Sequence, residues 1–138
     1  MIVVAGCAPG PKSSRGFTLP DGDAERGKAA FLKFRCYDCH SVEGVDLPTA
    51  EEPNQVIVAL GGDVTRIKTY GELVTSIINP SHKLAQGYSE VLVAANGESR
   101  MTNYNDVMTI SQVVDLVAFL QAHYKLRPYE PTTYTPYY

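Results

Sequence analysis

Several residue types and patterns that mark common functional classes are scarce or absent in this chain. Its 138 residues include no tryptophan and only three cysteines, too few for a disulfide framework or for a zinc site built from two cysteine pairs. Positive charge is also scarce, because 12 Lys and Arg stand against 15 Asp and Glu. With a net charge of −3 and no visible basic patch, nothing indicates a nucleic-acid partner. No apolar stretch is long enough to span a bilayer, and the length suits one domain with a small core.

Two of the three cysteines lie in the most specific pattern of the chain, Cys36-Tyr37-Asp38-Cys39-His40. Cys-x-x-Cys-His is the attachment motif of a c-type haem. In that chemistry the two thiols bond to the two vinyl groups of one porphyrin. The histidine that follows them supplies a ring nitrogen as the proximal ligand of the iron. The motif therefore predicts one covalently bound haem c, attached at Cys36 and Cys39, with His40 on the iron.

Three other interpretations of the cysteine pair remain open. Zinc would need two further ligands, and His82 and His123 are available, although not at the short spacing of a zinc-finger pair. A thioredoxin-like redox pair would need a βαβ context, which the pattern of the chain does not indicate. A simple disulfide between Cys36 and Cys39 is the third.

A closed haem iron needs a sixth ligand on the face opposite His40, and four residues can supply it: Met101, Met108, His82 and His123. Met108 immediately precedes a helix cap and is explained as a core residue, while His123 is expected on the surface. Met101 lies in a loop distant in sequence from His40, where the chain can cross the far face of the ring. We therefore expect Met101 to be the ligand, with His82 next and a gap-filling core role as the alternative for either methionine.

The remaining cysteine, Cys7, follows the small apolar run Val4-Ala5-Gly6. This pattern resembles the lipobox of bacterial lipoproteins, in which cleavage leaves the cysteine as a lipidated N-terminus. The apolar segment is shorter than a complete signal peptide, so the rest of such a peptide would lie upstream. A chance cysteine is the alternative. The stretch that follows is rich in Pro, Gly and Ser, and residues 1–20 are expected to form a lipobox-like segment and a tether.

Periodic apolar residues and capping signals predict three helices in the domain, which we place at residues 21–127. The first begins at Asp21 or Asp23 and ends near Phe34, and Gly27 inside it indicates a close helix–helix contact. The other two are expected at residues 70–78 and from Thr109, which starts a capping box, to about Tyr124.

Outside these helices the patterns are weaker. Residues 55–60 are apolar and β-branched and suit a short strand, residues 81–88 read as a loop, and residues 90–105 show no clear period. The tail, residues 128–138, consists of Pro, Thr and Tyr with one Glu, and is expected to form an extended arm.

Together these segments resemble a class I cytochrome c of the mono-haem bacterial type over roughly residues 21–124. The fold that this resemblance implies is mainly α, with N- and C-terminal helices crossing around a covalently bound c-type haem and with extended arms at both ends. The segments that carry it are Gly27-Lys28-Ala29-Ala30-Phe31, Cys36 to His40, Met101-Thr102-Asn103-Tyr104, and Asp115-Leu116-Val117-Ala118-Phe119-Leu120.

The resemblance implies specific roles. Gly27 and Phe31 would cross the last helix at Leu116 and Phe119, and Met101 would be the axial ligand although Thr102 replaces the family's proline. A proline carbonyl, that of Pro48 or of Pro53, would hold the ring of His40. The segments Ile77-Ile78-Asn79-Pro80 and Gly87-Tyr88 also resemble cytochrome modules of respiratory complexes.

The function implied is one-electron transfer to or from a membrane or periplasmic redox enzyme, by a carrier that is not itself an enzyme. Its partner would be a redox protein or respiratory complex, with no nucleic acid and no small-molecule substrate. It would lie on the periplasmic side of a bacterial membrane, held there through Cys7. The alternatives are a haem enzyme or gas sensor with an open iron site, and a cytochrome subunit that the Tyr-rich tail fixes in a larger complex.

Overall fold

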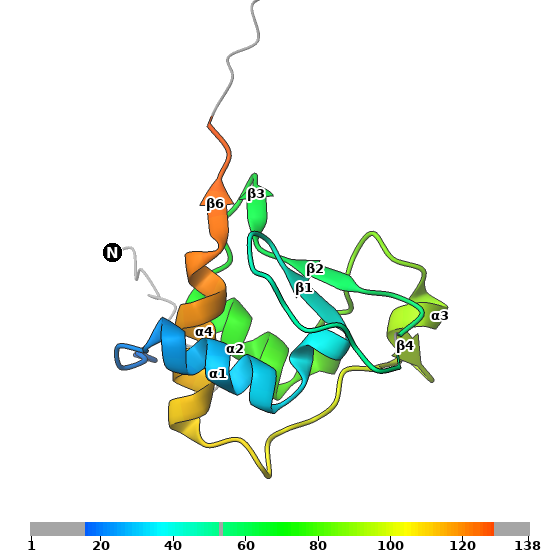
Figure 1. Cartoon of the computed structure of the whole chain (residues 1–138), viewed down its shortest axis with the longest axis horizontal. Coiled ribbons are helices and arrows are strands. Elements are labelled where there is room, and N and C mark those ends of the chain that lie inside the picture. The colour runs from blue at the N-terminus through cyan, green and yellow to red at the C-terminus, as the bar shows by residue number, and fades with distance from the viewer. Residues whose placement is uncertain (1–15, 53, 129–138) are drawn as a thin grey trace, which may run out of the picture.

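A computed structural model describes residues 16–52 and 54–128 of the chain, and Cys7 and most of the predicted C-terminal arm lie outside them. Helices and short strands alternate along this part of the chain (Figure 1). The helices are α1 (Ala24–Lys33), α2 (Tyr70–Ile78), α3 (Glu90–Val93) and α4 (Ile110–Ala122), with short 3-10 turns at Cys36–Asp38 and Pro80–His82. The strands are β1 (His40–Val42), β2 (Val58–Leu60), β3 (Gly62–Val64), β4 (Ala94–Ala95), β5 (Glu98–Ser99) and β6 (Tyr124–Leu126).

Within the described residues, the strands make this a mixed α/β fold, with four helices and few short strands, where the sequence indicated a mainly α protein. They form three separate two-stranded sheets: β1 with β2 and β3 with β6 are parallel, and β4 with β5 is antiparallel. Only β2 falls in a segment that the sequence predicts as a strand. The β4–β5 hairpin turns at Asn96-Gly97, both with positive φ, and Asn-Gly between short strands is a recognised hairpin signal that the sequence analysis missed.

Helices α1 and α4 cross in direct contact at Gly27, as the sequence predicts (Figure 1). A Cβ atom on Gly27 would overlap the carbonyl oxygen of Asp115 and would lie 2.7 Å from the Cβ of Phe119. One turn further along α1, the ring of Phe31 meets the ring of Phe119 edge to face, with centroids 5.7 Å apart. Leu116, the other residue expected at the crossing, is buried in the same core cluster.

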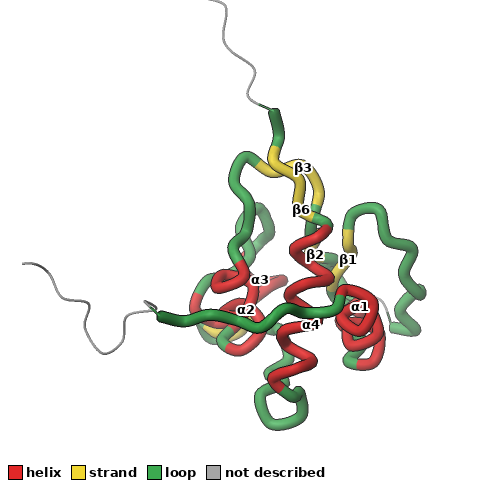
Figure 2. The backbone as a smooth tube through the Cα atoms, turned by 90° about the vertical axis from the view of Figure 1, so that its left-hand side faces the viewer, coloured by secondary structure: helices red, strands yellow, loops and turns green. Residues whose placement is uncertain are grey.

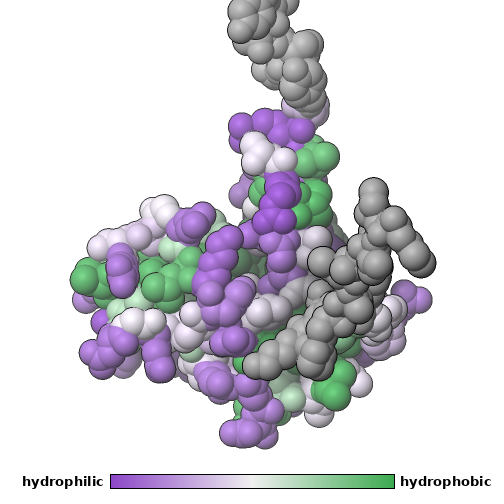
Figure 3. Space-filling view, turned by 180° about the vertical axis from the view of Figure 1, so that it is seen from behind, coloured by the Kyte–Doolittle hydropathy of each residue, from purple (hydrophilic) through white to green (hydrophobic). Residues whose placement is uncertain are grey.

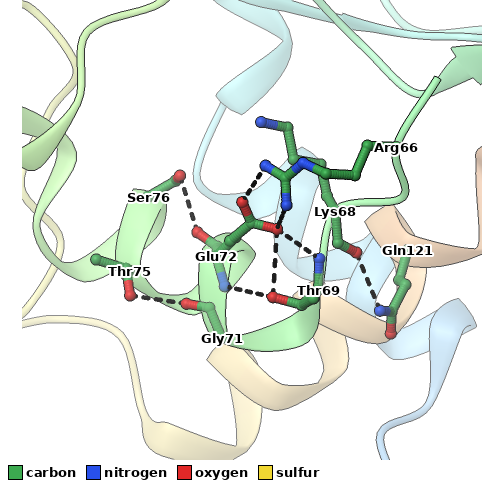
Figure 4. Close-up of polar contacts among 8 residues, drawn as sticks. All are labelled: Arg66, Lys68, Thr69, Gly71, Glu72, Thr75, Ser76 and Gln121. Atoms are coloured by element: carbon green, nitrogen blue, oxygen red, sulfur yellow. Dashed lines mark hydrogen bonds and ion pairs between the residues drawn. The ribbon is translucent and has the colours of Figure 1, made fainter. Parts of the chain in front are cut away.

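Side-chain caps set the beginnings of the three longer helices. Asp23 accepts a hydrogen bond from the backbone N–H of Arg26 and so caps α1. Thr109 and Gln112 form the predicted capping box of α4, and Thr69 and Glu72 form a second one that starts α2. Figure 4 shows the α2 cap, in which the Glu72 carboxylate also accepts hydrogen bonds from a neighbouring arginine.

The core lies among α1, α2 and α4. The segment that precedes α1 runs over the surface of α2 and α4. Figure 2 shows the segment before α1 as a loop that passes α2 and α4. The ring of Phe17 in this segment is tilted against that of Tyr70, with centroids 6.2 Å apart, and the Tyr70 hydroxyl donates a hydrogen bond to the Phe17 carbonyl. Gly22 lies against α4. Among the described residues, no helix is long and apolar enough to cross a membrane. The buried cluster consists of Phe31, Val42, Leu73, Val74, Ile77, Leu116, Val117, Phe119 and Leu120.

One charged residue is buried at the helix crossing. Asp115 is only 6% exposed, and its carboxylate accepts hydrogen bonds from Arg26 Nε at 2.8 Å, Arg26 Nη2 at 3.1 Å and the Asp23 backbone N–H at 2.8 Å. The Arg26 hydrogen bond, followed by that of Asp23, lowers the pKa of Asp115. The pair therefore ties the first turn of α1 to the middle of α4.

Replacing Gly27 with Ala should destabilise the protein, because the new methyl group would meet the α4 backbone rather than a movable side chain. We expect a loss of about 2 kcal/mol or more in the free energy of unfolding, measured in denaturant. Gly71→Ala in α2 is the matched control, because only Thr69 Oγ1, at 3.9 Å, lies near the added atom. That change should stabilise by up to about 1 kcal/mol. Equal effects of the two changes would contradict a close crossing at Gly27.

Replacing Asp115 with Asn should lower stability at pH 7 by an amount that shrinks in acid. The folded pKa of Asp115 lies below its ordinary 3.8, so the ion pair contributes fully above that value. Its contribution is lost as pH falls through the lower, folded pKa. Unfolding midpoints of both proteins at pH 7, 5 and 3 measure this, and a difference that stays the same at pH 3 would contradict it.

Candidate cofactor-binding site

The two cysteines lie at the ends of a single tight turn that follows α1. Phe34 ends the helix, and Arg35 then takes a left-handed conformation with φ of 54°, which is unusual for a residue with a side chain. Arg35 Nε donates to Asp38 Oδ2 at 2.9 Å, and the Asp38 N–H donates to the Arg35 carbonyl at 3.0 Å. Across this turn the Cys39 N–H donates to the Cys36 carbonyl. The clasp between Arg35 and Asp38 therefore helps to hold the conformation that presents both sulfurs.

Both cysteines are free thiols, so the structure does not contain the alternative disulfide between them. Burial raises the pKa of Cys36 to about 11, and burial also raises the pKa of the more exposed Cys39. The carboxylate of Asp38 adds to both increases. Because both pKa values are raised, both thiols are protonated at neutral pH. The other oxygen of Asp38, Oδ1, is buried and has no hydrogen-bond partner among the described residues.

Asn54 holds the second cysteine from outside the motif. Its side-chain nitrogen donates to the carbonyl of Asp38 at 3.0 Å and lies 2.9 Å from Cys39 Sγ. Nothing in the sequence singles out this residue, because it belongs to an irregular stretch with no periodic signal. Its position follows from the β1–β2 pairing, which brings the chain after residue 54 back alongside His40.

His40 is oriented by the backbone of the neighbouring strand. It begins β1, its register partner in β2 is Val58, and its Nδ1 lies 3.2 Å from the Val58 carbonyl oxygen. Since a carbonyl can only accept, this contact assigns the proton to Nδ1 and leaves the lone pair on Nε2. Burial lowers the pKa of His40 despite the opposing effect of that hydrogen bond, so the ring is neutral at pH 7. A proline carbonyl was expected here. The structure places the carbonyl of Val58 at Nδ1 rather than that of Pro48, and Pro53 lies outside the described residues.

These residues fit a c-type haem. A metal-ligating histidine typically donates its second ring N–H to a carbonyl, as His40 does to Val58. The two free thiols immediately before it match the two covalent bonds that the motif predicts. Zinc, in contrast, needs a set of ligands, and no group of three or more His, Cys, Asp or Glu side chains suited to a metal comes together in residues 16–52 and 54–128.

The loop that carries Met101 returns to the cysteine turn. Met101 is half-buried just after β5, and its backbone N–H donates to Ser99 Oγ at 3.2 Å. Three residues later, the hydroxyl of Tyr104 donates to the Phe34 carbonyl at 2.9 Å, and the two rings lie 5.4 Å apart. Phe34 is separated from Cys36 by one residue, so Tyr104 fixes the Met101 loop beside the cysteine turn.

The other three candidates for the sixth ligand have different environments. Met108 packs against the core cluster, as its expected core role requires. His82 is exposed, and its Nδ1 lies 2.8 Å from the Asn79 carbonyl in the turn that follows α2. His123 caps the end of α4 and is half-buried, with its ring edge to face with that of Phe119 at 5.0 Å.

Replacing Tyr104 with Phe should loosen the Met101 loop, because the ring contact with Phe34 stays while the hydrogen bond to its carbonyl is lost. We expect a loss of about 1 kcal/mol in the free energy of unfolding. Tyr70→Phe is the control, since its hydroxyl makes an exposed and longer hydrogen bond, at 3.2 Å, and should contribute less. If hydrogen exchange of the backbone amides from residue 101 to 105 is unchanged in Tyr104→Phe, the hydroxyl does not anchor this loop.

A scan against protein-family models, a search among curated proteins and a search among solved structures each gave no match for the chain.

Proposed function

We propose that the protein is a mono-haem cytochrome of the class I type, which carries single electrons on a haem c bound to Cys36, Cys39 and His40. The observation that carries this proposal is the pairing of two free thiols in one turn with a histidine whose Nδ1 faces a backbone carbonyl. Further support comes from the direct crossing of α1 and α4 at Gly27, which the family resemblance implies. The bound haem would supply a one-electron couple between ferrous and ferric iron.

The residues of the chain would hold the haem iron and leave it no site for an outside ligand. His40 is held in one tautomer, neutral, with its Nε2 available, so no proton has to leave before it binds metal. Met101 would be the second residue to hold the iron, on a loop that Tyr104 ties to the turn before Cys36. If His40 and Met101 both hold the iron, it would have no place for a small-molecule substrate, and the protein would be a carrier rather than an enzyme.

The proposed setting follows from the attachment chemistry and from the N-terminal pattern. Thioether formation takes place outside the bacterial cytoplasm, so we place the protein on the periplasmic side of the membrane. Cys7, which lies outside the described residues, would carry the lipid anchor. The partner would be a redox protein or respiratory complex, and the net charge of −3 suits a docking surface that is basic on the partner.

The first test asks whether haem is attached and whether its iron is closed. The full chain is expressed with a haem-attachment system, and intact mass and the reduced spectrum are recorded with and without carbon monoxide. We expect one covalent haem and no spectral change with carbon monoxide. Met101→Ala should open the iron and allow carbon monoxide to bind. Met108→Ala is the matched control, because that methionine packs against the core and should leave the iron closed.

The outcomes separate the alternatives. A chain that acquires no haem in a host that matures other c-type cytochromes would contradict the whole proposal. Haem attachment with ready carbon monoxide binding to the unmodified protein would instead favour an enzyme or gas sensor with an open site. If Met101→Ala stays closed and His82→Ala opens the iron, the carrier function stands and the ligand is His82.

A further inference from the structure

A shallow hollow of about 420 Å³, separate from the cysteine turn, is lined by four cationic side chains: Arg66, Lys68, Lys83 and Arg127. Among the described residues, Asp63 is the one carboxylate in its lining. The hollow therefore carries positive charge, although the whole chain has a net charge of −3. The sequence shows no basic patch, and it is the fold that gathers these cations. The four cations lie in three different parts of the sequence, so no run of positive charge reveals them.

The fold brings the cations together through the β3–β6 pairing. Val64 in β3 is in register with Leu126 in β6, and the Arg127 N–H donates to the Val64 carbonyl at 2.9 Å. Arg127 therefore lies beside the segment that leads from β3 to Arg66. Lys83 enters from the 3-10 turn after α2. Figure 3 shows hydrophilic side chains below the point where the C-terminal segment leaves the domain, while apolar side chains gather on the side that carries α3.

Arg66 is held in place while most of its hydrogen-bonding capacity stays available. Its Nη1 and Nη2 donate to the two Glu72 oxygens at 3.1 and 2.6 Å, and Glu72 is fixed in turn by the α2 capping box (Figure 4). The Arg66 hydrogen bonds lower the pKa of Glu72 to about 2, so this pair persists at all physiological pH values. A guanidinium has five N–H donors, and this arrangement uses two of them.

The other three cations lack such compensation. The Lys68 carbonyl accepts a hydrogen bond from Gln121 Nε2 at 3.2 Å, which fixes the backbone of this residue (Figure 4). Within residues 16–52 and 54–128, no carboxylate lies within 4.0 Å of the charged nitrogens of Lys68, Lys83 or Arg127. Like charges that converge on a hollow focus a positive potential there, which an anion relieves.

We propose that this basic hollow binds a phosphate-bearing anion. Phosphate matches the lining because a fixed guanidinium offers directed donors and the lysines supply compact charge. The ligand could be the phosphate of an anionic lipid headgroup or of a small water-borne compound, since both present the same group. The inference does not depend on haem binding, because the hollow and the cysteine turn share no residue.

The test compares two double variants of the full chain that remove the same charge. Lys83→Gln with Arg127→Gln changes the hollow, and Lys28→Gln with Lys33→Gln changes α1. Affinity is measured by titration with inorganic pyrophosphate and by co-sedimentation with phosphatidylglycerol vesicles, with phosphatidylcholine vesicles for comparison. The hollow variant should lose roughly tenfold or more in affinity and the α1 variant much less. Both probes should bind more weakly as salt rises.

The two probes also distinguish the sources of phosphate. Binding of pyrophosphate alone identifies a small dissolved ligand, and binding of the anionic vesicles alone identifies a lipid surface, and each supports the site. Equal losses in the two double variants would overturn it, as would the absence of binding to both probes. Binding of poly-glutamate with none of either phosphate probe would also overturn it, in favour of an acidic protein partner. Unchanged circular dichroism of the hollow variant confirms that the comparison concerns folded protein.

Discussion

Helices α1 and α4 meet at Gly27 with no side chain between the two backbones, and most other features take their position from this contact. The direction of α1 decides where Phe34 ends it and hence where the turn of Cys36 and Cys39 begins. The end of α4 decides where β6 starts, and β6 aligns β3 and brings Arg127 to the basic hollow. The carboxylate of Asp115, bound to Arg26, fixes the same crossing one turn away from the rings of the core.

The three longer helices could be predicted from the sequence because their determinants are local, whereas the single-turn helix α3 shows no such pattern. A capping side chain lies within three residues of the amide that it binds, and an apolar face repeats within one or two turns, so Thr109 with Gln112 identifies α4 without knowledge of the fold. The strands are three residues long or shorter, and four of them, β1 with β2 and β3 with β6, pair with partners that are distant in sequence. Tyr124 shows the difference: local pattern places it in the last helix, while pairing with Gly62 makes it a strand residue.

The candidate site, too, could be predicted only in part. Its three chemical groups belong to one five-residue motif, so Cys36, Cys39 and His40 could be named from spacing alone. The groups that orient them could not, because the Val58 carbonyl and the Asn54 amide reach the motif across 18 and 15 residues of chain. The basic hollow is still less visible in the sequence, since its cations lie in three separate segments between Arg66 and Arg127.

The hydrogen bond between His40 and the Val58 carbonyl has a consequence for how this site can change over evolutionary time. Every amino acid has a main-chain carbonyl, so the acceptor does not depend on which side chain occupies position 58. Substitutions there can adjust packing and strand propensity while the imidazole keeps its tautomer and direction. The orientation of the histidine therefore does not depend on the side chain at position 58. It depends on strand register, which an insertion between β1 and β2 would change.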